Sequence, residues 1–466
     1  MIPKIIHYCW FGQKPIPETF AAYINDWKLL LPDYAFIKWD ENNSPMHLPY
    51  IATAITKKNW ANVSNLVRLW AVYTQGGIYL DTDVQLLKNL DNLLELRCFF
   101  GKEQGQKRIF VNNAVMGAEA GHWFIKKCWI DLLYQFDGTE KANLSSPVLT
   151  TRLLEEIELI PHDEPQQIED IHLFPSSVFH PRPWFDPGQA VINDNTLGIH
   201  HYAKTWGEDG HKTSIPWHKN WMDVAKKPFR KWVNPDLFGQ LMRNKTVNDG
   251  PFKGVKYSRT QAYGSSVLPK LTGSYEACLH AIWYELLLNN YNIIIHLGAG
   301  EGYYVNGMQQ LFQPVNGSIA VECDLRNVAL LKENLEVNGL ADKVTIISEK
   351  AVAEHLQHWG GPGRKLWICD IEGDEKNLFT SASVQHLAES DLVIELHEFK
   401  DRGMVDHISK VFCHSHSIQL VQENEMDPVS KRFLVSSQEA ANAFQCLDER
   451  RPEAMRWAVI RSRKFI

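Results

Sequence analysis

The sequence predicts an α/β protein of two domains, the second built on a doubly wound, mostly parallel sheet. The chain has 466 residues, of which 44% are hydrophobic and 22% charged, values typical of globular proteins. Strand-like and helix-like hydrophobic patterns alternate in both halves, as in strand–helix–strand units. Residues 207–260 are rich in Lys, Arg, Asn, Gly and Pro. We therefore expect domains at 1–225 and 261–466, joined by a linker at 226–260.

The first half alternates apolar runs with segments whose apolar residues recur at helical spacing. In chain order, the predicted elements are a strand at 2–10, a helix at 18–31, a strand at 34–39, a helix at 62–74 and a strand at 78–80. Pro32 ends the first helix, and the pair Gly76-Gly77 ends the second. The last strand leads directly into Asp81-Thr82-Asp83.

The second half shows the same alternation with longer apolar runs. Strands are predicted at 293–297, 318–322, 344–347, 366–370 and 392–396, with helices after the first strand and at 327–338. Runs that are apolar on both faces are typical of central parallel strands. In such a doubly wound sheet, a ligand binds at the carboxyl ends of the strands.

Charge and cysteine usage narrow the class of protein. The net charge is -7, so no basic excess is available to neutralise a nucleic-acid backbone. The eight cysteines are scattered without a CxxC pair, which indicates reduced thiols and a cytoplasmic location. No apolar run approaches the roughly 18 residues of a membrane span. The basic, aromatic residues 226–233 favour a solvated helix, with peripheral contact at the inner face of a membrane as the alternative.

The acidic pair Asp81 and Asp83 stands at the end of a strand, where both side chains can converge on one ion. Carboxylates are the ligands that Mg²⁺ and Mn²⁺ prefer. A metal in this position would neutralise a leaving diphosphate, the main electrostatic demand in breaking a nucleotide–sugar bond. The pair therefore indicates a metal-assisted sugar transfer.

Five ordered segments resemble glycosyltransferase family 32 and the related clostridial toxin glucosyltransferases. They are IPKIIHYCWFG, AAYINDWK, SNLVRLWAVYTQGGIYLDTDV, NNAVMGAEAGHWF and HHYAKTW, and they span about residues 1–210. The resemblance implies a Rossmann-like GT-A fold, a nucleoside-diphosphate sugar as donor, with a UDP-sugar expected, Mn²⁺ or Mg²⁺, and transfer with retention of configuration.

The same resemblance implies roles for individual residues. The donor-binding residues would be Trp10, Asn65, Arg68, Tyr79, Asp81 and Trp206, and the metal ligands Asp81, Asp83 and His201. Asp83 and Arg68 would be catalytic, Asp83 as a direct metal ligand and Arg68 by holding the donor sugar. Trp10 would stack on uracil. The family usually has Asp where this chain has Asn65, which leaves the identity of the sugar open.

A glycine turn follows the first apolar strand of the second half. Gly298, Gly300 and Gly302 let a cofactor approach the backbone, and Glu322 ends the next strand, where it can accept ribose hydroxyls. A dinucleotide prefers GxGxxG, but position 303 is Tyr. The shorter turn favours S-adenosylmethionine over a dinucleotide.

Residues 262–466 resemble FkbM-type S-adenosylmethionine-dependent O-methyltransferases. The segments are LTGSYEACLHAIWYELLLNNYNIIIHLGAGEGYY, CDIEGDEKNLF, DLVIELHEF and RPEAMRWAVIRS. The resemblance implies a class I methyltransferase fold, with Asp370 beside the sulfonium and Tyr275 and Glu276 capping the cofactor. The departure is His296, where the family usually has Asp.

Polar residues gather after two strands of this half, namely Asp370, Glu372, Glu395 and His397. A sugar hydroxyl is a poor nucleophile, so its methylation needs a base or a metal. His397 suits a catalytic base; Glu372, Glu395 and His397 also suit a second metal site, and a structural histidine held by carboxylates remains the alternative.

Together these features predict a bifunctional enzyme of surface polysaccharide biosynthesis. One half would transfer a hexose to a glycan or lipid-linked saccharide, and the other would methylate a sugar hydroxyl. Two alternatives stay open: a toxin-like protein glycosyltransferase, and an enzyme in which one domain has become a binding module. The sequence is silent on oligomeric state.

Overall fold

The structure is a computed structural model that describes residues 1–186, 188, 190–203, 237–359, 361–423 and 454–465. The chain divides into two compact units, Met1–Ser214 and Ile215–Ile466. Each unit is an α/β domain, as predicted. The predicted site residue Trp206 and the basic segment 226–233 lie outside the described residues.

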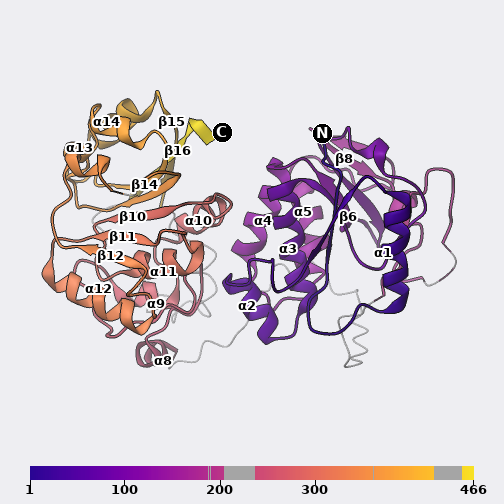
Figure 1. The fold of residues 1–466 in the computed structure, drawn as a ribbon, viewed down its shortest axis with the longest axis horizontal. Helices are drawn as coiled ribbons and strands as arrows, with labels where there is room; N and C mark the ends of the chain where they lie inside the picture. The colour runs from indigo at the N-terminus through magenta and orange to yellow at the C-terminus, as the bar shows by residue number, and fades with distance from the viewer. Residues whose placement is uncertain (187, 189, 204–236, 360, 424–453, 466) are drawn as a thin grey trace. The chain divides into compact units, whose positions relative to one another are not determined.

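The described part of the first unit contains a seven-stranded mixed sheet (Figure 1). From edge to edge its strands are β2 (Ala35–Trp39), β1 (Ile5–Cys9), β3 (Gly77–Leu80), β6 (Ile109–Ala118), β5 (Cys98–Gln104), β8 (Ile171–Phe174) and β7 (Gln166–Ile168). β1, β2 and β3 run parallel, whereas β6 is antiparallel to both β3 and β5. The parallel strands therefore bring the ends of β1 and β3 to one edge.

Helices cover both faces of this sheet, with α1 on one side and α2 to α5 on the other (Figure 1). The helices are α1 (Glu18–Leu30), α2 (Pro49–Thr56), α3 (Trp60–Gln75), α4 (Trp123–Gln135), α5 (Leu149–Glu155) and α6 (Ser176–Phe179). Gly77 follows α3 with a φ of +109°, and a Cβ there would lie 2.7 Å from the Ile5 carbonyl oxygen. Only glycine permits this close approach of β3 to β1.

The second unit contains another seven-stranded sheet among its described residues. Its order is β12 (Val344–Ile347), β11 (Ser318–Val321), β10 (Ile293–Leu297), β13 (Lys365–Cys369), β14 (Ser390–Leu396), β16 (Arg456–Ser462) and β15 (His416–Gln422). The first five strands are parallel, and β16 is antiparallel to both of its neighbours. The parallel strands are those predicted from their continuous apolar runs.

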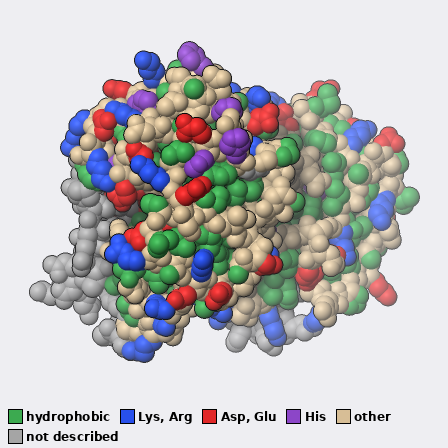
Figure 2. Space-filling model, turned by 60° about the vertical axis from the view of Figure 1, so that its left-hand side comes forward, with side chains coloured by type: hydrophobic (Ala, Val, Ile, Leu, Met, Phe, Trp, Pro, Cys, Tyr) green, Lys and Arg blue, Asp and Glu red, His purple; other side chains and the backbone are tan. Residues whose placement is uncertain are grey.

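The helices of this unit belong to crossovers between the strands or precede the sheet. They are α8 (Leu237–Asn244), α9 (Val267–Thr272), α10 (His280–Leu286), α11 (Tyr303–Phe312), α12 (Leu325–Val337), α13 (Glu375–Leu378) and α14 (Met404–Phe412). The core includes Trp367, Phe379 and Ile394, all fully buried. On the face shown in Figure 2, acidic and basic side chains are interspersed, and histidines gather toward its upper end.

Part of the predicted linker is folded into the second unit. Phe252 is buried, and its ring lies 5.2 Å from that of Tyr303 and 5.6 Å from that of Tyr304. The Tyr257 hydroxyl donates a hydrogen bond to Glu301 at 3.1 Å. Periodicity did not reveal this segment because it packs through isolated aromatic side chains in irregular backbone.

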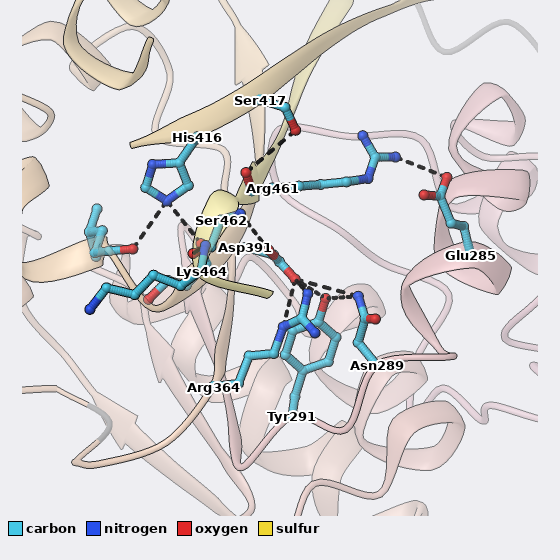
Figure 3. Close-up of polar contacts among 12 residues, drawn as sticks. Glu285, Asn289, Tyr291, Arg364, Asp391, His416, Ser417, Arg461, Ser462 and Lys464 are labelled. Carbon is cyan, nitrogen blue, oxygen red and sulfur yellow. Dashed lines mark hydrogen bonds and ion pairs between the residues drawn. The ribbon is translucent and has the colours of Figure 1, made fainter. Parts of the chain in front are cut away.

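A buried carboxylate connects three parts of the second unit (Figure 3). Asp391, at the start of β14, is fully buried. It accepts hydrogen bonds from Tyr291 at 2.6 Å, from Arg364 at 2.6 Å and from the backbone amide of Ser462 at 2.9 Å. Asp391 therefore fixes the end of β16 against the loops that precede β10 and β13.

No described helix combines the length and the apolar character that crossing a membrane requires. The cysteines in the described residues carry free thiols.

Candidate functional site

The acidic pair of the first unit lies where the parallel strands end. In the register of β1 and β3, His7 is opposite Tyr79, so Trp10, which follows β1, and Asp81, which follows β3, lie at one edge of the sheet. The backbone amide of Asp81 donates to the Ala114 carbonyl oxygen at 2.8 Å. This bond holds the beginning of the acidic turn against β6.

Two buried side chains hold Asp81. Arg68 donates to Asp81 Oδ1 at 3.1 Å, and the Tyr79 hydroxyl donates to the same oxygen at 2.8 Å. The Arg68 guanidinium lies 4.6 Å from the centre of the Tyr79 ring. Burial raises the pKa of Asp81, and the positive charge of Arg68 opposes this shift. The described contacts of Arg68 and Tyr79 therefore position Asp81, and their predicted contacts with the donor stay predictions.

The third ligand-type side chain is His200. The ligand atoms of Asp81, Asp83 and His200 all lie within 4.8 Å of one another. β4 (Val84–Leu86) pairs with β9 (Gly198–His200), and Val84 is opposite His200. His200 Nε2 consequently comes within 3.4 Å of Asp83 Oδ1.

Asp83 and His200 shift each other's titration. Burial opposes the charged form of Asp83, but the charge and hydrogen bond of His200 outweigh it and lower the pKa of Asp83 to about 2. Burial likewise opposes the charged form of His200, but the charge of Asp83 outweighs it and raises the His200 pKa above its usual value. Asp83 is therefore an ionised carboxylate throughout the physiological range.

The sequence-based prediction assigned His201 to the metal, whereas the structure brings its neighbour to the acidic pair. His201 Nε2 lies 3.2 Å from Gln85 Oε1, and the His201 ring stacks on Tyr23 with centroids 5.2 Å apart. Adjacent side chains of an extended segment point to opposite sides. Because His200 faces Asp83, His201 faces α1 instead.

The predicted donor-binding residues differ in their freedom to contact a ligand. Asn65 is buried, and its amide group donates to the Ala142 carbonyl oxygen at 2.8 Å and to Ser145 Oγ at 3.1 Å. The amide N–H groups of Asn65 therefore hold the segment 142–145. Trp10 is half-buried, and its indole N–H donates to the Lys14 carbonyl oxygen at 2.7 Å.

Sequence reasoning missed a buried carboxylate behind His200. The Tyr202 hydroxyl donates to Glu103 Oε2 at 3.0 Å, and Asn112 donates to the same oxygen at 2.6 Å. The rings of Tyr202 and His200 lie 4.1 Å apart. The sequence gives little signal for this contact, because Glu103 stands between Lys102 and Gln104 at the polar end of β5.

The second unit has a cavity of about 560 Å³ at the carboxyl edge of its parallel strands, with Gly298, Gly300 and Glu322 in its wall but not Gly302. Gly298 has a φ of +79°, and a Cβ there would lie 1.7 Å from the Asp370 carbonyl oxygen. Gly300 also has a positive φ, but a Cβ there would meet nothing within 4 Å. Gly298 is therefore needed for the fold, whereas the space beside Gly300 is open.

Glu322 lies beside this turn. Its carboxylate accepts hydrogen bonds from the Gly300 amide at 2.8 Å and from the Asp324 amide at 2.7 Å. A carboxylate held by backbone amides is oriented before a ligand arrives, so little ordering remains to be done on binding.

Other predicted residues of the second unit line the same cavity: Tyr275, Glu276, His296, Gly298, Gly300, Glu322, Asp370, Glu372, Glu395 and His397. The Tyr304 hydroxyl donates to Glu276. Both ring nitrogens of His296 are buried without a hydrogen-bond partner among the described residues. Burial lowers the pKa of His296 to about 3, so this imidazole is neutral.

Asp370, Glu372 and His397 form another group whose ligand atoms lie within 4.8 Å of one another. Burial raises the pKa of Asp370 to about 6, against the influence of His397. Glu375, which the sequence did not indicate, lies behind His397 and is fully buried.

Comparison with known proteins finds one family model, which matches part of the first unit. Residues 17–100 match the family model described as a glycosyltransferase sugar-binding region containing a DXD motif. Inositol phosphoceramide mannosyltransferase 3 of Schizosaccharomyces pombe is 31% identical over 130 residues, which cover 27% of this chain and 35% of that enzyme. Lactosylceramide 4-alpha-galactosyltransferase of Gorilla gorilla gorilla is 29% identical over 176 residues, 38% of this chain and 43% of that enzyme. The chain thus spans less than half the length of these two relatives.

Solved structures with partial likeness include the PaToxG glycosyltransferase, with 21% identity and a TM-score of 0.28 over 33% of this chain and 69% of that chain. Precorrin-6y C5,15-methyltransferase from Geobacter metallireducens has 14% identity and a TM-score of 0.29 over 39% of this chain and 86% of that chain. The fold of each unit rests on its own strand order and register.

Proposed function

We propose that the first unit transfers a hexose from a nucleoside-diphosphate sugar, with a divalent cation held by Asp81, Asp83 and His200. The observation that carries this proposal is the convergence of the three side chains at the carboxyl edge of a sheet within a DXD glycosyltransferase region. A UDP-sugar donor and retention of configuration belong to the proposal and rest on the resemblance of residues 1–210.

The residues present fit a hard divalent cation. Asp83 is ionised, and the hydrogen bonds that Arg68 and Tyr79 make to Asp81 are both received by Oδ1. The Oδ2 atom of Asp81 receives neither of these bonds and is therefore the oxygen that can face an ion. When bound, Mn²⁺ or Mg²⁺ supplies positive charge opposite the leaving diphosphate.

The chain's own residues would orient the donor around that charge. Arg68 and Tyr79 hold Asp81 in one orientation, so the acidic turn is in place before the donor binds. We propose that Trp10, at the same edge, stacks on the base. We propose that Asn65 contributes to the sugar pocket through its carbonyl oxygen, because its amide group already donates to Ala142 and Ser145.

The acceptor is proposed to be a glycan or a lipid-linked saccharide. The names of two relatives specify the ceramide lipids inositol phosphoceramide and lactosylceramide, which favours a lipid-linked acceptor over a protein side chain. We propose that the product belongs to a cell-surface glycan. A toxin-like protein glycosyltransferase is the competing function.

We propose that the second unit binds S-adenosylmethionine and methylates a sugar hydroxyl. Support comes from a cavity that joins the glycine turn, Glu322 and Asp370. The antiparallel strand β16 beside β14 also distinguishes this sheet from the parallel 3-2-1-4-5-6 order of dinucleotide-binding folds. Glu322 would accept the ribose hydroxyls, the glycine turn would pass along the methionine portion, and Asp370 would face the sulfonium.

A second candidate is that one unit has become a binding module. Two observations favour it: the amide group of Asn65 already has partners, and neutral His296 stands where the methyltransferase family usually has Asp. Titration of the full chain with UDP plus Mn²⁺, and separately with S-adenosylmethionine, tests each unit. Absence of one of these binding events would exclude the chemistry proposed for that unit.

Activity of the first unit is tested by a screen of UDP-sugars for hydrolysis with and without Mn²⁺. In the Asp83→Ala variant we expect hydrolysis to fall about a hundredfold, because the diphosphate charge is then uncompensated, while S-adenosylmethionine binding stays unchanged. Asp33→Ala, a substitution at an exposed carboxylate, is the control. Near-normal hydrolysis by the Asp83 variant would exclude this metal assignment.

Cofactor binding by the second unit is tested with Glu322→Ala. Loss of the bonds to the ribose should weaken the binding of S-adenosylmethionine by about 1.5–3 kcal/mol. An unchanged affinity would show that the glycine turn does not hold this cofactor.

A further inference from the structure

A second group of metal-ligand type lies in the cavity of the second unit. Asp370 directly follows β13, and His397 directly follows β14. These strands are parallel neighbours in which Cys369 is opposite Ile394, so their ends meet at one edge. His397 Nε2 lies 3.5 Å from Asp370 Oδ1 and 3.9 Å from Glu372 Oε2. Both separations are too long for a good hydrogen bond but suit atoms that share an ion.

The imidazole of His397 is held in one orientation. His397 is 2% exposed, and its Nδ1 lies 2.8 Å from Oε1 of the fully buried Glu375. Because a carboxylate can only accept, Nδ1 carries the proton of the neutral ring. The lone pair of Nε2 then faces Asp370 and Glu372. A carboxylate behind a histidine is the usual outer-shell arrangement of metal-bound imidazole.

An independent observation points to a missing partner at this place. The Asp370 side chain is 42% exposed and hydrogen-bonds Glu395, but its Oδ1 atom is buried and accepts no hydrogen bond from any described residue. Leaving such an oxygen without a partner is unfavourable. The nearby amine of Lys400 is bound to Glu372 Oε2 and to the Glu372 carbonyl oxygen, each at 2.7 Å. Both of these Lys400 bonds therefore go to Glu372 and neither goes to Asp370.

We propose that Asp370, Glu372 and His397 bind a divalent cation inside this cavity, with Glu375 as a positioning residue. Two carboxylates and one imidazole suit Mn²⁺ and related first-row ions. The three side chains line the cavity, so hydroxyl oxygens of an acceptor would complete the coordination. Only this consequence rests on the proposed methyl transfer. Binding of the cation does not depend on it.

The experiment counts Mn²⁺ ions on the full chain by the loss of the free-ion signal in electron paramagnetic resonance. Asp83→Asn removes the proposed site of the first unit, so one Mn²⁺ should remain bound. Adding Glu372→Gln should lower the affinity for that Mn²⁺ ion at least tenfold. The Glu372 side chain is 67% exposed, so this change does not disturb the core. His414→Gln, at an exposed histidine, is the matched control.

Direct coordination is tested by electron spin-echo modulation in the Asp83→Asn background. Bound Mn²⁺ should show coupling to a ¹⁴N nucleus, and His397→Gln should abolish that coupling. Glu375→Gln should lower Mn²⁺ affinity about 10–100-fold and alter the ¹⁴N coupling, which a merely structural role would not change.

Two results would overturn the proposal: no Mn²⁺ on the Asp83→Asn chain, or an ion whose affinity is unaffected by Glu372→Gln. The first would leave His397 as a catalytic base. S-adenosylmethionine is titrated in parallel. Loss of cofactor binding with Mn²⁺ retained would reject the proposed methyl transfer and leave the cation site standing.

Discussion

At the scale of single residues, two adjacent histidines offer a sharp test of the first site. His200 approaches Asp83, whereas His201 stacks on Tyr23. We expect His200→Ala to reduce Mn²⁺-dependent donor hydrolysis about a hundredfold, and His201→Ala to change it less than about threefold. Measured rates at saturating Mn²⁺ check this expectation. The reverse ranking would return the metal to His201, as the sequence alone suggested.

Gly300 provides a second residue-scale prediction. Gly300→Ala should lower the affinity for S-adenosylmethionine at least tenfold, because the added methyl group enters the space of the proposed cofactor. Gly339→Ala is the matched control: Gly339 also has a positive φ and open space around it, so both variants carry a similar backbone strain of about 1 kcal/mol. Calorimetric titration compares them. Equal affinities for the two variants would place the cofactor elsewhere.

His296 predicts a pH dependence of stability. Burial lowers its pKa to about 3 in the folded chain from an ordinary value of 6.5, so below pH 6.5 the unfolded chain takes up a proton that the folded chain refuses. Its contribution to stability should fall by about 1.4 kcal/mol per pH unit, or about 2 kcal/mol at pH 5. His296→Phe should lose this dependence. Urea unfolding at pH 7 and pH 5 measures this pH dependence for wild type and for the variant. The control His414→Gln should keep the pH dependence of wild type.

At the scale of secondary-structure elements, Asp391 connects β14 to the end of β16 and to two loops. Asp391→Ala would leave the partners Arg364, Tyr291 and the Ser462 amide without an acceptor. We expect the free energy of unfolding of the second unit to fall by about 3–5 kcal/mol. Lys464→Ala is the control, because it breaks only an exposed pair with Glu389, worth about 0–1 kcal/mol. Equal effects of the two variants in urea unfolding would contradict this role for Asp391.

At the scale of the whole molecule, each unit has its own hydrophobic core. We expect fragment 237–466 to fold alone and bind S-adenosylmethionine. A fragment that begins at Gly254 lacks the buried Phe252 and should melt about 10 °C lower, since losing a buried Phe typically removes about 3–5 kcal/mol. Thermal unfolding compares the two. Equal melting temperatures would restore residues 237–253 to the linker that the sequence predicted.

Amino-acid patterns alone determined the α/β class, the five parallel strands of the second sheet, and the acidic and glycine turns at strand ends. These features depend on local periodicity and on residues adjacent in the chain, which a sequence displays directly. The prediction placed residues 226–260 in a linker because irregular backbone that packs through separate aromatic residues has no period.

Tertiary structure decided which distant side chains meet. Pairing of β4 with β9 selected His200 rather than His201, because strand register determines which of two neighbouring side chains faces Asp83. The fold brought the buried Glu375, on α13, to His397, which follows β14. The partners of Asn65 come from a segment about eighty residues away along the chain. Such contacts depend on register and packing between elements distant in sequence, so no local pattern could predict them.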